Sequence, residues 1–382
     1  MDKNNGKSIK RIIVARNAYR WQYGGAEQYA YNLAAGLAGE GVQTTVVSRV
    51  PELLQHCRRA NIRSFRNIWF KNETHRRWMP FYYLLMPVLI GQYVLLIWRT
   101  RADLMVLTSR DDQIFGTMAA KLTGTPVIWF DHGDMKNIVA RPFRFLSKSY
   151  YWALRNADRV IMTSAAEHDK ITANFPVSKQ GNFVTINNGA LKGSGKRMDR
   201  PADKKIVAFV GRLDRDKGIF DLVDAAATVV KSVPDAQFWI AGKGQHEDEL
   251  RSKINELGLS EYFKLLGHLS NVWDLLVTAD VFVYPTHHDA APLAPMEAVI
   301  AGLPVLASRI GGIPEMLPSS AGVLLPSKDP EAWAVELIRV LSKPGVLEGL
   351  RNGAKESGHD LEFHTVLTKR YLPLFRQVVT QS

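Results

Sequence analysis

The sequence predicts an α/β protein made of two doubly wound domains, each with a parallel sheet. Its 382 residues are enough for two domains of ~150 residues each. Hydrophobic residues make up 46% of the chain and charged residues 23%, a globular composition that excludes wholesale disorder. Short apolar runs rich in β-branched residues alternate with helical stretches, and this alternation indicates parallel sheets covered on both faces.

Two series of apolar runs predict the strands of the two sheets. The first series is 11–15, 44–48, 104–108, 126–130, 159–163 and 184–187. The second series is 205–210, 237–241, 263–266, 281–285, 304–307 and 322–325. Because open parallel sheets bind ligands at the carboxyl ends of their strands, we expect the ligand there, facing a cleft between the two domains.

A polar stretch separates the two series of strands. Residues 190–203, ALKGSGKRMDRPAD, contain Gly, Ser and Pro and follow no helical or strand period, which predicts an interdomain linker and a hinge. The predicted domains are therefore residues 1–195 and residues 196–363.

Positive charge is concentrated in the first half of the chain. Residues 1–200 hold 30 Lys and Arg against 14 Asp and Glu, a net charge of +16, whereas residues 201–382 hold 19 against 23, a net charge of −4. This asymmetry indicates that the first half meets something anionic, such as a membrane surface, a lipid phosphate or a nucleic acid. A basic surface that serves only solubility is the alternative.

The segment 78–98, WMPFYYLLMPVLIGQYVLLIW, is almost wholly apolar and has Trp at both ends, as a membrane span has. However, Pro80, Pro87, Gly91 and Gln92 interrupt it, and a span here would place strands of one sheet on opposite sides of a bilayer. We therefore expect a helix that is buried or lies partly in a membrane interface. The basic stretch just upstream makes peripheral attachment to an anionic membrane a hypothesis.

The number of cysteines indicates the cellular compartment. The one cysteine, Cys57, excludes a disulfide scaffold and a multi-cysteine zinc site, and it fits a reducing cytosol. Since no N-terminal segment combines a basic start with a long apolar run, we expect no secretory signal.

A glycine turn follows the first predicted strand. Gly24-Gly25-Ala26-Glu27 opens an amphipathic helix, and glycines at such a turn let a phosphate approach backbone N–H groups at the positive end of a helix. The chain contains neither G-x-G-x-x-G at this turn nor G-x-x-x-x-G-K-[ST] anywhere, which argues against a dehydrogenase and a P-loop nucleotidase.

The second half begins with a strand that runs directly into cations. Gly211 and Arg212 follow the strand, and Lys217 precedes the next helix. An arginine and a lysine at a strand end can bind a diphosphate, although Arg212 could instead pair with Asp214 and Asp216. Gly242 and Lys243 follow another strand end and are expected close to the same ligand.

The stretch 285–315 is the most informative of the chain. A loop containing Asp289 follows a strand, and a helix then begins near Pro295 and carries Glu297. The free N–H groups of that first turn, Leu293 and Ala294 among them, can receive a phosphate. The two carboxylates can hold different parts of one ligand, such as a sugar ring and a ribose.

Taken together, these motifs resemble glycosyltransferase family 4, the retaining nucleotide-sugar transferases with the GT-B fold of two Rossmann-like domains. The resemblance covers nearly the whole chain. It rests on motifs that occur in the family's order and spacing: Gly24–Glu27, 210–218, 241–244, Gly267-His268, Ala279-Asp280, Asp289-x7-Glu297, 301–304 and 311–315.

The resemblance implies roles for particular residues. Arg212 and Lys217 would bind the donor diphosphate, Glu297 would contact the ribose, and Asp289, where the family usually has Glu, would lie beside the donor sugar. His132, which ends a first-domain strand, matches a position that faces the donor sugar, although a lone histidine there can also be structural. The last helix, about 364–382, would pack back on the first domain.

No bound metal or cofactor is expected. His287 and His288 are adjacent on a loop and have no evident third ligand, and the resemblance implies that cations from the protein replace a metal. The donor would be a nucleotide diphosphate sugar, and the departing phosphate would take the acceptor proton.

The basic first domain is expected to bind the acceptor. A lipid-linked or glycan acceptor of envelope polysaccharide or glycolipid synthesis, at the cytoplasmic face of the cell membrane, suits its charge and its apolar segment. Three alternatives stay open: a sugar-nucleotide epimerase of the same architecture, a nucleic-acid binder, and a membrane scaffold without activity. No nucleic-acid-binding signature is present, so we expect no nucleic-acid partner.

Overall fold

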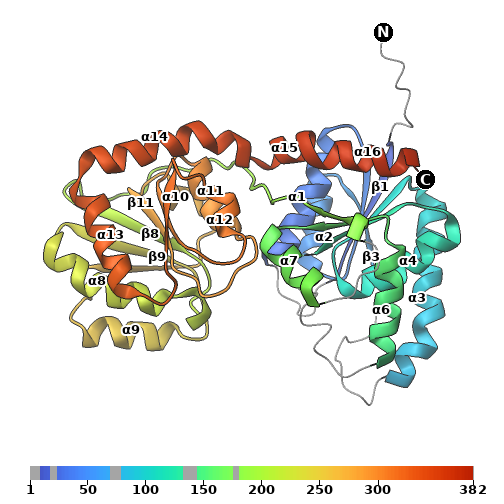
Figure 1. The fold of residues 1–382 in the computed structure, drawn as a ribbon, viewed down its shortest axis with the longest axis horizontal. Helices are drawn as coiled ribbons and strands as arrows, with labels where there is room; N and C mark the ends of the chain where they lie inside the picture. The colour runs from blue at the N-terminus through green and yellow to red at the C-terminus, as the bar shows by residue number, and fades with distance from the viewer. Residues whose placement is uncertain (1–8, 18–23, 69–78, 132–143, 175–179, 382) are drawn as a thin grey trace, which may run out of the picture. The chain divides into compact units, whose positions relative to one another are not determined.

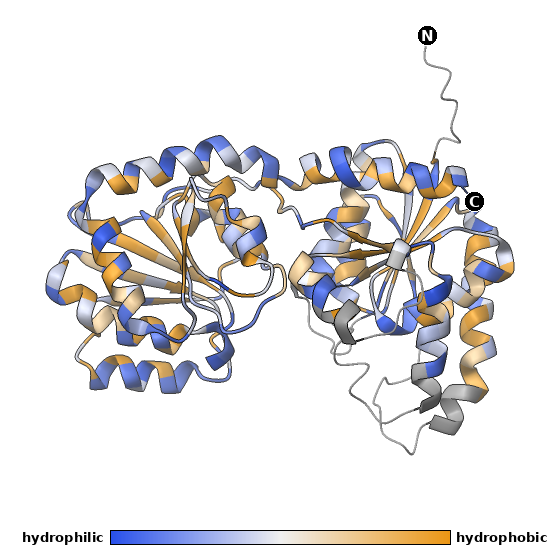
Figure 2. Ribbon diagram, viewed as in Figure 1, coloured by the Kyte–Doolittle hydropathy of each residue, from blue (hydrophilic) through white to orange (hydrophobic). Residues whose placement is uncertain are grey.

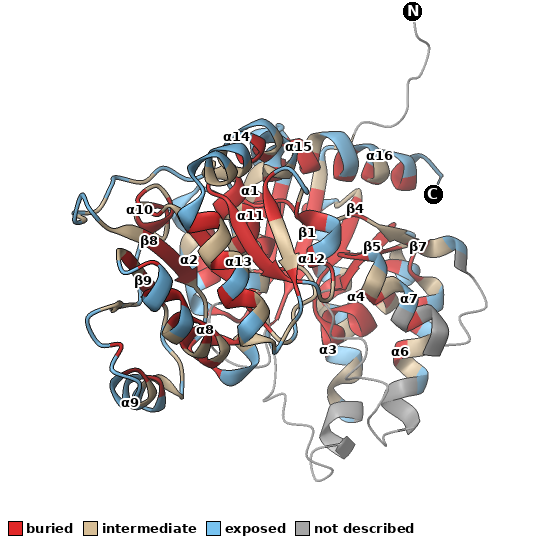
Figure 3. Ribbon diagram, turned by 60° about the vertical axis from the view of Figure 1, so that its left-hand side comes forward, coloured by how far each residue is buried: buried red, intermediate tan, exposed pale blue. Residues whose placement is uncertain are grey.

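The computed structural model describes residues 9–17, 24–68, 79–131, 144–174 and 180–381 and contains two compact units (Figure 1). Unit 1 comprises residues 1–186 together with 367–382, and unit 2 comprises residues 187–366. Each unit holds one parallel sheet with helices on both faces, which confirms the predicted fold class. In Figure 3 the strands of both sheets are mostly buried.

The sheet of unit 1 has the strand order β3-β2-β1-β4-β5-β6-β7, and its pairs are parallel. Its strands are β1 (Arg11–Arg16), β2 (Gln43–Ser48), β3 (Arg63–Arg66), β4 (Leu104–Leu107), β5 (Val127–Asp131), β6 (Arg159–Met162) and β7 (Phe183–Thr185). Its helices are α1 (Gly25–Gly39), α2 (Pro51–Arg59), α3 (Met79–Thr100), α4 (Arg110–Thr123), α6 (Arg144–Asn156), α7 (Ala165–Asn174) and α16 (Leu372–Gln381).

The strand β3 was not predicted from the sequence. Its residues, RSFR, lie at the edge of the sheet beside β2, and both of its arginines are exposed. An edge strand needs no continuous apolar run because one side of it faces solvent, so the pattern that found the central strands could not find this one.

One face of this sheet is covered by α3, α4 and α6. The core beneath them includes Leu89 and Tyr93 of α3, Phe115 of α4, Tyr150 of α6 and the central strand residue Trp129. The indole N–H of Trp129 donates a 2.8 Å hydrogen bond to Thr117 Oγ1, so even this large buried side chain has its polar atom satisfied.

The C-terminal segment completes unit 1. A five-residue π-helix (Leu367–Tyr371) leads into α16. Tyr371 and Phe375 pack edge-on against Phe130 of β5, with ring centroids 5.2 and 6.5 Å apart. The hydroxyls of Tyr371 and Tyr29 of α1 are hydrogen-bonded at 2.5 Å, and both rings are fully buried.

The sheet of unit 2 has the strand order β10-β9-β8-β11-β12-β13, again with parallel pairs. Its strands are β8 (Lys205–Val210), β9 (Ala236–Ala241), β10 (Phe263–Gly267), β11 (Val281–Tyr284), β12 (Val305–Ser308) and β13 (Gly322–Leu325). Its helices are α8 (Ile219–Ser232), α9 (Glu247–Glu256), α10 (Trp273–Leu276), α11 (Leu293–Ile300), α12 (Ile313–Met316), α13 (Pro330–Ser342), α14 (Pro344–Leu361) and α15 (Phe363–Val366).

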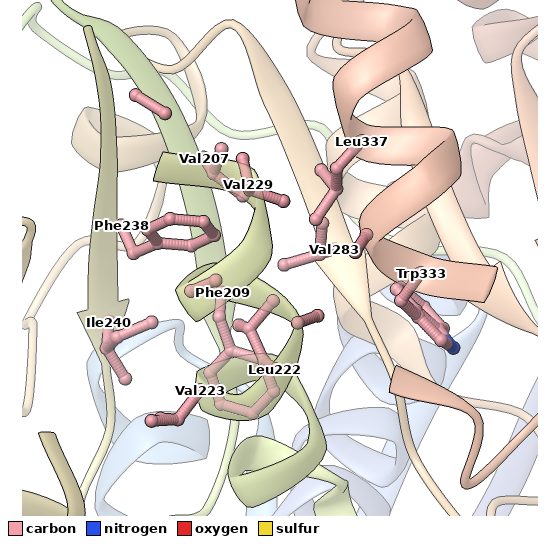
Figure 4. Close-up of a cluster of buried hydrophobic side chains, with 14 of the residues drawn as sticks. Val207, Phe209, Leu222, Val223, Val229, Phe238, Ile240, Val283, Trp333 and Leu337 are labelled. Atoms are coloured by element: carbon pink, nitrogen blue, oxygen red, sulfur yellow. The ribbon is translucent and has the colours of Figure 1, made fainter. Parts of the chain in front are cut away.

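Apolar side chains from three central strands and two helices fill one face of this sheet (Figure 4). Val207, Phe238 and Val283 point from β8, β9 and β11 toward Val229 of α8 and Leu337 of α13. At the start of α13, Asp329 Oδ1 accepts a 3.0 Å hydrogen bond from Ala332 N, so the helix carries its own N-terminal cap.

The prediction that residues 190–203 form a free hinge is wrong, because these residues pack against the rest of unit 2. Gly193 and Gly195 lie so close to Trp273 that an added Cβ would come within 2.3 Å of its atoms. Lys196 N donates to Asp274 Oδ1 at 2.7 Å and Met198 N donates to Thr278 Oγ1 at 2.8 Å. The segment lacks periodicity because it forms no helix or named strand and is held by backbone hydrogen bonds and glycine contacts. Composition alone cannot distinguish such a segment from a linker.

Residues 79–98 of the predicted apolar segment form most of α3. Leu89, Tyr93, Leu96 and Ile97 are buried in the core of unit 1. Among the described helices, none combines the length and the hydropathy that crossing a bilayer demands.

Candidate functional site

The candidate site lies at the carboxyl edge of the unit-2 sheet, where four loops meet. They follow β8 (211–217), β9 (242–244), β11 (285–292) and β12 (309–312). β8 lies between β9 and β11, so the chain turns to opposite sides of the sheet at this point, the usual position of a ligand site in this architecture.

Backbone hydrogen bonds join these loops to one another. Leu213 N donates to Lys243 O at 3.1 Å, His287 N to Asp216 O at 2.8 Å, and Gly312 N to Ala290 O at 3.0 Å. Loops held in this way offer ligand groups in fixed positions, which reduces the entropy lost on binding.

The backbone conformation at position 242 requires a glycine. Its φ is +146°, and a Cβ at this position would lie 1.8 Å from the carbonyl oxygen of Gly211. Gly242, one of the predicted glycines, therefore makes the close approach of the β8 and β9 loops possible. The neighbouring Lys243 is exposed and contributes its carbonyl to Leu213.

Arg212 makes the ion pairs that the sequence offered as its alternative role. Its guanidinium contacts Asp214 and lies 3.2 Å from Asp216 Oδ2, and its side chain is 64% exposed. An ion pair this exposed contributes about 0–1 kcal/mol. An incoming anion with two oxygens can replace these carboxylates at little cost, so the pairs hold Arg212 at the edge of the site without closing it.

Lys217 and Asp289, both predicted site residues, contact each other. Lys217 Nζ lies 2.7 Å from Asp289 Oδ2, and the hydroxyl of Tyr284 donates to the same oxygen at 2.8 Å. The Lys217 side chain is only 15% exposed, so this ion pair is much less accessible to solvent than the pairs of Arg212.

Tyr284 is a site residue that the sequence reasoning missed. It is the last residue of β11, it is buried, and its burial together with the Asp289 carboxylate holds its pKa well above the usual value. The hydroxyl is therefore a fixed donor to Asp289. A tyrosine at the end of an otherwise aliphatic strand, next to a predicted site loop, was the available signal.

Glu297, Leu293 and Ala294 lie on α11. This helix begins at Leu293, two residues before the predicted start, so Leu293 and Ala294 present the free N–H groups of its first turn, and Pro295 has none to offer. The side-chain carboxyl of Glu297 has no hydrogen-bond or ion-pair partner among the described residues, and burial raises its pKa to about 7. A half-buried carboxyl without a partner is available to a ligand hydroxyl.

The histidine pair of this loop is not arranged as a metal site. His287 Nε2 lies 2.6 Å from Asp221 Oδ2 of α8, an interaction that holds the loop against the helix. Over the described residues, His, Cys, Asp and Glu do not gather in groups of three or more that could hold a metal ion.

The first-domain candidates belong to unit 1. Gly24 N donates to Glu27 Oε2 at 3.0 Å, and Glu27 in turn forms a buried 2.8 Å ion pair with Arg16. This N–H is therefore occupied by the helix's own carboxylate, whereas Gly25, the first residue of α1, is exposed. His132 lies outside the described residues.

A buried network at the carboxyl edge of the unit-1 sheet was also missed. Asp112 is 1% exposed and accepts hydrogen bonds from Asn17, Ser109 and Tyr93, and burial raises its pKa to about 6. These partners come from the ends of β1 and β4 and from α3. The capping pattern S-x-x-D at Ser109 was the readable signal.

Comparison with known proteins assigns a family to both parts of the chain. The family model for glycosyltransferase family 4 matches residues 23–190, and the model for glycosyl transferases group 1 matches residues 196–357. These two matches together span the glycine turn of unit 1 and all four loops of the unit-2 site.

Two curated relatives match parts of the chain. The glycogen synthase of Mycobacterium tuberculosis is 29% identical over 224 residues, which are 57% of this chain and 54% of that protein. The D-inositol 3-phosphate glycosyltransferase of Saccharomonospora viridis is 28% identical over 246 residues, 58% of this chain and 56% of that protein. The chain thus spans about half the length of the curated relatives it matches.

A solved structure extends the likeness of fold to almost the whole chain. HepE from Anabaena, in complex with UDP, is 18% identical and has a TM-score of 0.77, with 96% of this chain and 99% of that one covered. The two parallel-sheet units, the joined loops at the unit-2 edge and the family models agree: the chain belongs to the family-4 glycosyltransferases of the GT-B fold.

Proposed function

We propose that the chain moves a sugar from a nucleotide diphosphate sugar to an acceptor hydroxyl, with retention at the anomeric carbon and without a metal ion. The observation that carries the proposal is the unit-2 edge, where Arg212, Lys217, the first turn of α11 and the partnerless Glu297 are held by loops that bond to one another. HepE, which shares the fold, was solved with UDP, and this supports a nucleotide donor.

The donor diphosphate would exchange partners with the protein's own carboxylates. Arg212 leaves Asp214 and Asp216, and Lys217 leaves Asp289, for the phosphate oxygens. As the bond from the anomeric carbon to the phosphate oxygen breaks, negative charge grows on the diphosphate, and the two cations and the α11 N–H groups stabilise this charge more strongly in the transition state than in the ground state. Two protein cations supply the charge that a metal would otherwise provide.

The remaining residues position the sugar and the nucleoside. Glu297 would accept hydrogen bonds from the ribose hydroxyls, and Asp289, released from Lys217 but still bonded to Tyr284, would face hydroxyls of the donor sugar. The family resemblance assigns His132 a role beside the same sugar. The leaving phosphate oxygen would take the proton of the acceptor hydroxyl as the new glycosidic bond forms on the same face.

The acceptor would be a lipid-linked or envelope glycan at the cytoplasmic face of the cell membrane. The +16 charge of residues 1–200 supports contact between unit 1 and an anionic membrane. The donor would bind unit 2, where Arg212 and Lys217 lie, and the membrane-held acceptor would bind the basic unit 1.

Thermal-shift screening against nucleotides and nucleotide sugars, with and without magnesium, tests the donor assignment. A ligand at a hundredfold excess over its dissociation constant stabilises the folded state by about 2.7 kcal/mol. We expect one nucleoside diphosphate and its sugar to raise the melting temperature equally with magnesium and with a chelator. A shift that needs magnesium would contradict metal independence, and no shift in folded protein would contradict donor binding.

The pKa of Glu297 predicts how donor affinity depends on pH. If the ionised carboxylate accepts the ribose hydrogen bonds, a group with a pKa of about 7 must lose its proton to bind, so affinity rises with pH through 7. The dissociation constant of a nucleotide sugar, whose doubly esterified diphosphate does not titrate in this range, is expected to be about tenfold larger at pH 6 than at pH 8. Calorimetry should show this slope in the wild type and a weak, flat profile in Glu297→Gln. The same slope in Glu297→Gln would assign the titration to another group.

A further inference from the structure

The outer face of α3 is apolar along its described length. Leu84, Val88, Leu95 and Trp98 are 72%, 56%, 50% and 67% exposed, and their spacing places them on one side of the helix, opposite the buried Tyr93 and its neighbours. In Figure 2 this helix is predominantly coloured hydrophobic. A contiguous exposed apolar face of this kind marks an interaction surface.

The neighbouring helix α6 adds an amphipathic stripe. Lys148, Trp152 and Arg155 are exposed and are spaced four and three residues apart, so they lie on one side of α6. Between α3 and α6 lies α4, which packs against both and carries the exposed pair Lys121 and Leu122 in its last turn. Aromatic, aliphatic and basic side chains therefore share one face of unit 1.

A polar pocket of about 340 Å³ lies beside this stripe. Its wall contains three basic side chains, Lys121, Arg155 and Arg159, against one carboxylate, Asp158. Lys121 pairs with Asp158 at 3.0 Å and Arg159 donates to the Asp158 carbonyl at 2.7 Å, whereas the guanidinium of Arg155 has no ion pair or hydrogen bond with any described residue. The pocket thus has excess positive charge and an arginine free to bind an anion.

We infer that this face of unit 1 docks on an anionic phospholipid bilayer. Leu84, Val88, Leu95, Trp98 and Trp152 would enter the boundary between headgroups and acyl chains, and the pocket around Arg155 would bind a lipid phosphate. Tryptophan beside basic residues, on helices that cannot span, is the composition of an interfacial surface, and charge complementarity favours lipid over a second copy of this basic unit. The inference deepens the membrane contact in the proposed function and rests on it.

Vesicle flotation of the full chain tests the inference. Wild type is expected to float with vesicles of phosphatidylcholine and phosphatidylglycerol, to float less with phosphatidylcholine alone, and to lose binding as salt rises. Arg155→Ala should weaken anionic-vesicle binding about fivefold, since a basic residue near the surface contributes ~1 kcal/mol. The triple variant Leu84→Ser, Val88→Ser, Trp98→Ser should weaken it more than tenfold.

Matched variants in unit 2 serve as controls. Val335→Ser replaces an apolar residue that is 63% exposed, and Arg197→Ala replaces an exposed arginine, so both should bind vesicles as wild type does. All substituted residues are exposed, and unchanged melting will show that the variants fold. The nucleotide-induced thermal shift should be unchanged in every variant, which separates a failure of docking from a failure of donor binding.

Several outcomes would overturn the inference. Equal vesicle binding by wild type and the triple variant would place any membrane contact elsewhere. Stabilisation of the wild type, but not Arg155→Ala, by inorganic phosphate without vesicle binding would make the pocket a site for free anions. Dimers in sedimentation that dissociate in the triple variant, without vesicle binding, would assign the face to a second copy of the chain.

Discussion

Replacing Lys217 with alanine is expected to lower turnover about 100- to 1,000-fold while the protein stays folded. The ammonium group would stabilise charge on the departing diphosphate, and one such donor in a dry site is worth roughly 3–4 kcal/mol of barrier. The Lys217 side chain is 15% exposed, so water cannot easily substitute for it. Steady-state kinetics with the donor identified by thermal shift measures kcat directly.

Lys253 offers a matched control in the same unit. It forms a Lys–Asp pair of similar length, 2.6 Å to Asp224 Oδ2, between α9 and α8. Lys253→Ala should leave kcat within a factor of two of the wild type. If the two alanine variants lose the same amount of activity, the effect of Lys217 is structural and its assignment to the diphosphate is wrong.

The second large effect is expected from Gly242→Ala. Its φ of +146° and the overlap of a new Cβ with the carbonyl of Gly211 force the β8 and β9 loops apart. A strained backbone and overpacking each cost ~1–3 kcal/mol, so the free energy of unfolding of unit 2 should fall by about 2–6 kcal/mol. Donor affinity should fall as well, because the hydrogen bond from Leu213 N to Lys243 O, which joins the two loops, is lost.

Gly349→Ala is the control for this substitution. Gly349 lies inside α14 and a Cβ there would meet nothing within 4 Å, so alanine should raise stability by about 0.5–1 kcal/mol. Calorimetric melting of both variants checks the two expected changes in stability. If Gly242→Ala melts at the same temperature as the wild type, the β8 and β9 loops are less tightly packed than in the structure.

The central strands were predictable because burial on both faces leaves a continuous apolar signal. Residues 205–210, for example, were predicted as a strand and form β8 with the same bounds. The edge strand β3 carries no such signal, and the stretch 190–203 carries a misleading one. Its glycines allow close packing on Trp273, whereas in composition they are typical of a flexible linker.

The candidate site was predictable as a set of residue types at strand ends, but its pairings were not. Sequence spacing cannot show that Lys217 reaches Asp289 rather than Asp216, because the loop after β11 must first be folded against β8. For the same reason Tyr284 and the Asp112 network escaped notice. Each acts through partners that are close only in space, such as Tyr93 of α3 and Asn17 after β1.

Unit 1 is completed by the last residues of the chain, and this imposes an order on biosynthesis. On the ribosome, residues 187–366 emerge in full before Tyr371 and Phe375 can cover Phe130, so unit 2 can reach its native state while unit 1 still exposes an aromatic face. A chain stopped near residue 366 would retain every nucleotide-site residue of unit 2 and lack Tyr371, whose hydroxyl is hydrogen-bonded to that of Tyr29. Unit 1, most of which is synthesised first, is therefore the unit that completes its folding last.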